Sequence, residues 1–475
     1  MTDPLHPPHD RAALPLAPAL DPALAQAHMP SRLPRLRRRL VASTLLAMAL
    51  AAVVALIAFG LTRLIALVTQ LAFFGQWSTT WASPATHQRG AWVIVIPVLG
   101  GLVVGLMARW GSRAIRGHGI PEAMEQVLTN ESRIAARMIW LKPLSSAVAI
   151  GTGGPFGAEG PIIATGGALG SYVGQLLPVT ADERKTLLAA GAAAGMAAIF
   201  AAPLAAVLLS IELLLFERRA RSLVPVAMAA ATGAAVRFAL EGPGPVFPML
   251  ALGPASFVAL SFYTALGLVF GVAGVAVTRL VYGLEDAFEK LPIHWMWWPA
   301  IGGLAVGLVG YVVPSTLGVG YENIVAVIGG HLTMGALAIL AFAKLVSWSI
   351  ALGSGTSGGT LAPLFTIGGA LGGLLGLALA HWPITQVDPR MAALVGMAAL
   401  FASASRAMLT AAVFVFETTM QPHALLPLLA ASVAAYLVSG LMMQHTIMTE
   451  KIARRGVHVP TDLVADHKPP HSAAR

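Results

Sequence analysis

The sequence predicts an all-α protein that crosses a membrane many times. Three observations lead to this prediction: 57% of the 475 residues are hydrophobic, only 11% are charged, and the mean hydropathy is +0.76. Soluble domains contain about 25% charged residues, so this composition does not suit a water-exposed surface. In lipid every backbone polar group needs a protein partner, which leaves helices or a closed barrel. The apolar runs are long and do not alternate as barrel strands do, so helices are favoured.

The two ends of the chain differ from this apolar body. Residues 1–34 are rich in Pro and Ala and are predicted to form a disordered tail. Arginines cluster between Arg32 and Arg39, directly before the first apolar run, so we expect a cytoplasmic N-terminus. Residues 456–475 are predicted to be a second cytoplasmic tail, which leaves 35–455 as the transmembrane domain. A basic cluster at a membrane boundary does not favour nucleic-acid binding, and without Cys the chain forms no disulfide or thiolate metal site.

The transmembrane domain contains an internal repeat. The segment from Pro97 to Leu106 matches Pro299 to Leu308, and Pro161 to Gly170 matches Pro363 to Gly372, both 202 residues apart. Several blocks in order at nearly constant spacing predict two copies of one unit, over about 40–240 and 255–445. With both ends cytoplasmic, an odd number of crossings per unit makes the copies inverted, and inverted repeats with interrupted helices place a substrate site near the middle of the membrane. Other matched pairs are Lys142 with Lys344, Gly151 with Gly353, Gly195 with Gly396, and Glu212 with Glu417.

Four Gly-rich breaks interrupt the apolar sequence. They are 117–121, 157–161, 317–320 and 353–363. Such breaks cannot face lipid and must be buried or line a cavity. A proline in three of them suits the first turn of a following helix, whose unpaired N–H groups and positive dipole end attract anions. Together the breaks predict an anion site built from main-chain dipoles, although a single break is better explained by a close helix crossing.

Glu159 is the most informative polar residue. It lies in the first turn of one predicted helix, where a carboxylate is stabilised. An acidic residue within the membrane is a functional candidate. A carboxylate here can occupy the anion site and block it, and protonation releases it. One residue can therefore act as gate and proton carrier.

These motifs resemble the CLC family of chloride channels and proton/chloride antiporters, of the bacterial type without C-terminal CBS domains. The matching segments are 117–122, 157–161, 191–212 and 359–363, and the likeness covers about 40–455. The resemblance implies a fold of tilted, interrupted helices in an inverted repeat. It implies a homodimer in a bacterial-type inner (plasma) membrane, with one anion pathway per subunit and no enzymatic activity or cofactor. It implies that Glu159 is the gate and that Gly119, Ile120, Thr360 and Leu361 contribute backbone N–H groups to the anion.

Other positions depart from the family pattern. His118 replaces the usual serine of the first motif, Met448 replaces the tyrosine of the last helix, and Leu361 replaces a phenylalanine. His118 and Met448 are still expected to line the anion site, with the His118 N–H or the Thr360 hydroxyl as substitute donors. The internal proton glutamate of many antiporters aligns with Leu213, one residue after Glu212, so both are candidates for a proton pathway.

Two mechanisms remain open. Leu213 cannot carry a proton, which favours channel-like or weakly proton-coupled chloride conduction. The alternative is stoichiometric proton/chloride antiport, in which Glu159 and water near Glu212 carry the proton. Fluoride is a further possible substrate. A remote alternative is a rhomboid-like intramembrane serine protease, because 355–358 matches its short Gly-x-Ser-Gly pattern; that enzyme also needs a His base, for which His381, His423 and His445 are the downstream candidates.

Overall fold

A computed structural model describes residues 33–217, 219–457 and 459, with side chains from residue 38 onward. The described part consists of helices and loops without strands, which confirms the predicted fold class. The predicted tails fall largely outside the described residues, although the first helix already begins at Leu33. The chain divides into two units, Met1–Ala42 and Ser43–Arg475, and the second carries every candidate site residue.

The first half of the chain contains helices α2 to α9. Their bounds are α2 Leu33–Thr69, α3 Val95–Trp110, α4 Ile120–Thr129, α5 Met138–Gly151, α6 Glu159–Leu176, α7 Ala181–Phe200, α8 Pro203–Leu209 and α9 Ala220–Glu241. Two helices continue as π-helical segments, α2 into η2 Gln70–Phe74 and α8 into η6 Ser210–Leu215.

The second half contains helices α10 to α18. Their bounds are α10 Phe257–Glu289, α11 Trp298–Val312, α12 Tyr321–Gly329, α13 Met334–Gly353, α14 Leu361–Ala380, α15 Pro389–Ser405, α16 Met408–Thr419, α17 Leu425–Met442 and α18 Glu450–Arg454. Short 3₁₀ turns lie in the connections: η3 Pro84–Thr86, η4 Gly90–Ile94, η5 Arg113–Ile115, η7 Trp295–Trp297, η8 Pro314–Thr316, η9 Pro383–Thr385 and η10 Pro422–Ala424.

Eight helices of the described residues are long and apolar enough to cross a membrane. Other apolar helices are shorter, among them Met138–Gly151, Pro389–Ser405 and Met408–Thr419. A helix needs about 20 residues to span the hydrocarbon core, so α5 with 14 residues and α16 with 12 are too short to cross it alone. This mixture of long and interrupted helices places several helix ends inside the protein, as the Gly-rich breaks predicted.

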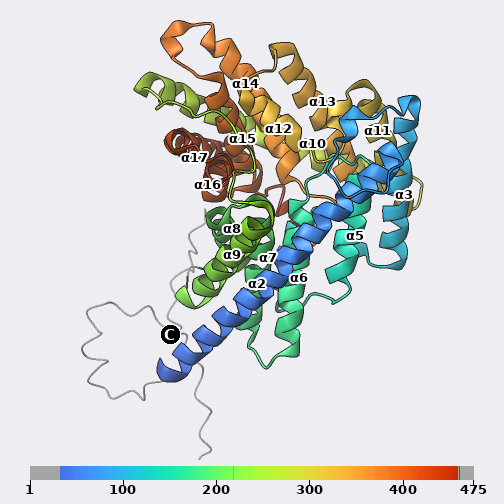
Figure 1. The fold of residues 1–475 in the computed structure, drawn as a ribbon, viewed down its shortest axis with the longest axis vertical. Helices are drawn as coiled ribbons and strands as arrows, with labels where there is room; N and C mark the ends of the chain where they lie inside the picture. Colours follow the sequence, from blue (N-terminus) through green and yellow to red (C-terminus); the bar gives the residue numbers. More distant parts are fainter. Residues whose placement is uncertain (1–32, 218, 458, 460–475) are drawn as a thin grey trace, which may run out of the picture. The chain divides into compact units, whose positions relative to one another are not determined.

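The core lies around α7 and α15. After their first turns both are apolar on all sides, and the residues from Leu187 to Phe200 and from Met391 to Ser405 are buried. Figure 1 shows α7 beside α6, and α15 beside α14. Glycines allow these close crossings, because a Cβ added at Gly166 would lie 2.2 Å from the Gly191 carbonyl oxygen.

Contacts in one half recur in the other. The buried Lys142 Nζ donates to the carbonyls of Ile115 and Gly117, each at 2.8 Å. Lys344, 202 residues later, donates at 2.9 Å to two carbonyls in the equivalent loop before α12. A Cβ at Gly101 would lie 2.1 Å from the Pro299 carbonyl oxygen. A Cβ at Gly303, the matching glycine of the second half, would lie 2.3 Å from the Pro97 carbonyl oxygen. Two copies of one unit would produce such pairs, which supports our proposal of repeats over 40–240 and 255–445.

Candidate functional site

The starts of α4, α6 and α14 meet at one place in the structure. A Cβ added at Gly160 would lie 2.0 Å from the His118 carbonyl oxygen and 3.0 Å from Gly359 Cα. Gly157 and Gly359 exchange two backbone hydrogen bonds, with N···O distances of 3.2 and 2.9 Å. Since backbones touch here, a larger residue at Gly160 would force them apart. Three helix N-termini therefore share one buried region.

Glu159 is the first residue of α6 and is fully buried. Its Oε1 accepts a hydrogen bond from the Tyr321 hydroxyl at 3.1 Å. Its Oε2 lies against the glycine turns, because a Cβ at Gly157 would be 1.6 Å away and one at Gly359 would be 2.9 Å away. Oε2 makes no hydrogen bond to any described residue. The carboxylate therefore folds back into the turn that begins its own helix, where the helix dipole favours negative charge.

The predicted anion donors lie at the same helix starts. Thr360 precedes α14, and its buried hydroxyl has no hydrogen-bond partner in the described part of the chain. Leu361 and Ile120 are buried at the first positions of α14 and α4. The Gly119 N–H, in contrast, donates to Glu122 Oε2 at 2.8 Å and is already engaged. Glu122 follows the helix-starting Gly119 by three positions, and this capping-box spacing is the sequence signal that predicts the hydrogen bond.

His118 lies two residues before the first residue of α4, and Met448 lies two residues before the first residue of α18. His118 is buried, lies near the Ile447 carbonyl, and has no partner for Nδ1 among the described residues. Met448 is also buried, and its N–H donates to the Thr446 hydroxyl at 3.1 Å. The Tyr282 hydroxyl donates to the Ile447 carbonyl at 2.9 Å. Thus Met448 supplies no hydroxyl, and Tyr282, which the sequence did not single out, holds the adjoining backbone.

A charged cavity of about 690 Å³ reaches His118. Its basic side chains come from the η5 region and from the segment of α18, and its acidic side chains come from α4 and α10. The Arg116 guanidinium lies 5.1 Å from the Trp295 ring and 5.3 Å from the Trp298 ring. Hydrogen bonding to Asp286 raises the pKa of the Arg454 guanidinium, so this charge persists at any physiological pH. The charged lining residues are Arg113, Arg116, Glu122, Glu125, Glu285, Glu289, Lys451, Arg454 and Arg455.

Glu212 and Leu213 lie away from this cavity, at the contact of α8 with α16. Leu213 is buried. The Glu212 carboxylate accepts from two backbone N–H groups at the start of α16, at 3.0 and 3.1 Å, and from the Thr410 hydroxyl at 2.6 Å. Glu417, at the end of α16, accepts in turn from two backbone N–H groups at the start of α8, at 2.8 and 3.0 Å. Glu212 therefore caps the start of α16, and Glu417 caps the start of α8.

The serine of the protease-like pattern has a different environment. The Ser357 hydroxyl is buried and lies 3.1 Å from the Ser145 hydroxyl and 2.9 Å from that of Ser146. A serine nucleophile needs an adjacent general base, and two hydroxyl groups do not provide one. The arrangement instead joins the α14 loop to α5.

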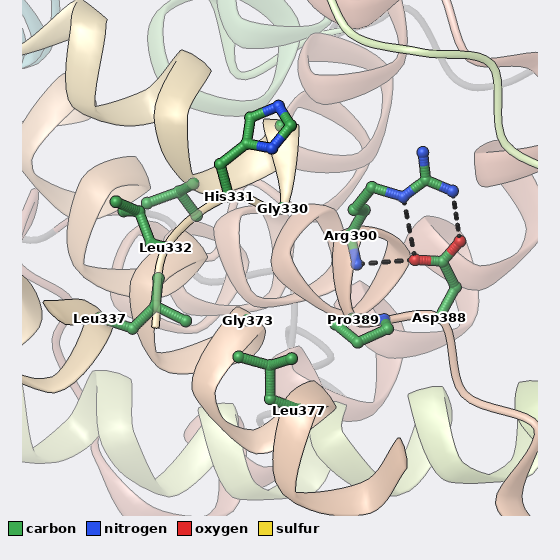
Figure 2. Close-up of a pocket in the computed structure, with 11 residues that line it drawn as sticks. Gly330, His331, Leu332, Leu337, Gly373, Leu377, Asp388, Pro389 and Arg390 are labelled. Atoms are coloured by element: carbon green, nitrogen blue, oxygen red, sulfur yellow. Dashed lines mark hydrogen bonds and ion pairs between the residues drawn. The ribbon is translucent and has the colours of Figure 1, made fainter. Parts of the chain in front are cut away.

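A second pocket of about 300 Å³ lies where α12 ends and α15 begins. Figure 2 shows the Arg390 guanidinium paired with Asp388, with Nε···Oδ1 of 3.2 Å and Nη2···Oδ2 of 2.8 Å. None of the predicted site residues lines this pocket.

Comparison with known proteins identifies the family. The sequence model described as "Voltage gated chloride channel" matches residues 99–440, most of the chain. The chain belongs to this family. Family membership makes it a multi-pass membrane protein of the anion-transporting class rather than an enzyme, which removes the serine protease alternative.

Two relatives and a solved structure are similar to the chain. A ClcB-like protein of Ralstonia nicotianae is 28% identical over 366 residues, covering 76% of this chain and 85% of that protein. The "H(+)/Cl(-) exchange transporter ClcA" of Yersinia pestis is 30% identical over 362 residues, covering 74% of each. The crystal structure of a slow cyanobacterial Cl-/H+ antiporter has a TM-score of 0.78 at 22% identity, covering 87% of this chain and 97% of that one. The last similarity shows that the family fold is present.

Proposed function

We propose that the protein exchanges chloride for protons across the membrane, with Glu159 as both the anion gate and the proton carrier. The observation that carries this proposal is the burial of the Glu159 carboxylate where α6, α4 and α14 begin. The Yersinia pestis relative, which is 30% identical, is called an H(+)/Cl(-) exchange transporter. This similarity favours antiport over the channel-like conduction suggested by Leu213.

In the proposed cycle the charged carboxylate occupies the position that an anion would take. Its Oε2 lies in the turn formed by Gly157 and Gly359. Protonation removes the charge that the helix N-termini stabilise, so the side chain leaves and an anion replaces it. We propose that the anion then contacts the first-turn N–H groups of Ile120 and Leu361 and the Thr360 hydroxyl, with His118 and Met448 lining its inner exit.

The inner half of the proton route differs from that expected for an antiporter with a second glutamate. Leu213 cannot hold a proton, and we propose that Glu212 acts as a helix cap. The charged cavity at His118 can hold water, which can deliver protons toward Glu159. This arrangement supports a second candidate function, chloride transport that is only weakly or slowly coupled to proton movement.

A pair of substitutions distinguishes a helix cap from a proton carrier. Glu212→Gln and Glu417→Gln each weaken a charge-assisted cap, so each should lower the free energy of unfolding by about 1–2 kcal/mol. Thermal unfolding in detergent measures this loss. We expect both variants to keep the proton-to-chloride ratio of the parent. Loss of proton transport in the Glu212 variant alone would instead assign Glu212 to the proton route.

The orientation and assembly are also part of the proposal. We propose that both termini and the charged cavity face the cytoplasm of a bacterial cell and that two copies form a homodimer in the plasma membrane. The arginines of 32–39 support the orientation, because they lie before and at the start of the first apolar span, Arg38–Phe74. The family resemblance supports the dimer.

Flux measurements on liposomes containing the purified protein test the proposed function. A chloride gradient imposed without a proton gradient should drive protons uphill, with a fixed ratio between the two fluxes. Chloride flux without proton movement would overturn antiport and favour the channel-like alternative. Competition among chloride, fluoride and nitrate in the same assay identifies the preferred anion.

A further inference from the structure

Tyr321 holds the Glu159 carboxylate from the opposite half of the chain. Its hydroxyl donates to Glu159 Oε1 at 3.1 Å, across 162 positions of sequence. The other carboxylate oxygen makes no hydrogen bond to a described residue. Besides the backbone N–H groups of Glu159 and Ala362, the Tyr321 phenol is therefore the side-chain donor that holds the carboxylate.

The position of Tyr321 is itself determined by the preceding turn. Tyr321 begins α12, directly after Gly318 and Gly320, whose φ angles are +66° and +76°. Lys344 Nζ donates to the carbonyls of Thr316 and Gly318 at 2.9 Å each, so the turn is tied to α13. The hydroxyl therefore projects from a fixed backbone.

Aromatic rings surround the Tyr321 ring. Trp81 stacks on it at 6.3 Å between centroids, and the Trp81 indole N–H donates to Glu322 at 2.7 Å. Phe200 and Phe247 approach edge-on, at 5.9 and 5.8 Å. Replacing Tyr by Phe would leave these ring contacts in place. An apolar surrounding also strengthens the hydrogen bond that the phenol donates to the carboxylate.

Few charged groups face this pair. Arg237 of α9 interacts electrostatically with Tyr321, but its guanidinium donates to the Ile199 carbonyl and pairs with Glu241. Glu322 is bound to Trp81, and Lys344 is bound to the turn behind α12. From α14 the carboxylate meets backbone rather than charge. The Tyr321 hydroxyl is thus the side-chain group whose hydrogen bond depends most directly on whether the Glu159 carboxyl group is charged.

We propose that Tyr321 is a positioning residue whose hydroxyl holds the Glu159 carboxylate in the blocking position and so sets the pH at which the pathway opens. The proposal rests on the proposed role of Glu159 as the gate. A donated hydrogen bond favours the charged, blocking form over the neutral, released form. Without it, a lower proton concentration suffices to open the pathway.

Tyr321→Phe tests the proposal, because it removes the hydroxyl and keeps the ring. A hydrogen bond to a charged group changes such an equilibrium about tenfold, so the midpoint of chloride flux against pH should move upward by about one unit. Tyr263→Phe is the matched control. The Tyr263 hydroxyl accepts from the Asp388 N–H at 2.9 Å, outside the site, and its loss should leave the midpoint unchanged.

The same substitution in a Glu159→Gln background completes the test. With no carboxylate to hold, Tyr321→Phe should have no effect on the pH profile there. An unshifted midpoint in the single variant, a flat profile in the parent, or an equal shift in the Glu159→Gln background would each overturn the proposal. Thermal unfolding of each variant shows whether the fold is intact. The test measures chloride flux alone, so it does not depend on whether protons are transported. Uncoupled chloride flux would refute antiport, and the shift caused by Tyr321→Phe could still be measured.

Discussion

Replacing Glu159 with glutamine should abolish proton movement while chloride movement continues. The amide has nearly the same shape as the protonated acid but can neither bind nor release a proton at physiological pH. Without a negative charge it also has no electrostatic reason to stay at the helix N-termini, so an anion can take its place. Proton flux should therefore fall to the leak of protein-free liposomes, and chloride flux should lose its dependence on pH.

A control keeps this result specific to the gate. Glu183 caps α7, where its carboxylate accepts from the Thr180 N–H at 2.8 Å, outside the site. Glu183→Gln makes the same chemical change and should retain coupled transport. Proton flux that persists unchanged in the Glu159 variant would refute its role as the proton carrier.

Substitution of Gly157 by alanine should open the pathway without touching Glu159 itself. A Cβ at Gly157 would lie 1.6 Å from Oε2, and its three nearest atoms all belong to the Glu159 carboxyl group. That group ends a flexible side chain, so it can move aside while the backbone stays. We expect chloride flux that no longer falls at high pH, with a change in the free energy of unfolding below about 1 kcal/mol.

Gly283→Ala provides the matched control for this steric experiment. Gly283 lies in α10, and no atom is within 4 Å of an added Cβ. Its flux and pH profile should match those of the parent. A Gly157→Ala protein that is stable and still closes at high pH would contradict the blocking position assigned to Glu159.

The membrane fold and the helix starts could be predicted from the sequence because their signals are local. Hydropathy determines whether a segment suits lipid, and Gly followed by Pro marks where a helix begins, as at Gly119–Pro121 and Gly359–Pro363. The internal repeat then indicated that these starts belong together. Glu159 stood out because an acid is rare in such sequence.

The partners of these groups could not be predicted in the same way. The Tyr321–Glu159 hydrogen bond joins residues 162 positions apart, and nothing near either residue indicates the other. The engagement of the Gly119 N–H by Glu122 was a missed local signal. For Glu212, the match with Glu417 hinted at a shared role, but only the packing of α8 on α16 shows that each caps the other's helix.

The central claim is a buried anion site at converging helix N-termini that Glu159 blocks, and bromide diffraction tests it most directly. Crystals of the Glu159→Gln protein grown in bromide should show an anomalous peak between the turns of Gly157, Gly359 and Ile120. The parent at high pH should show none at that position, because the carboxylate fills it. A bromide-free site in the glutamine variant, with peaks only in the charged cavity at His118, would contradict the account.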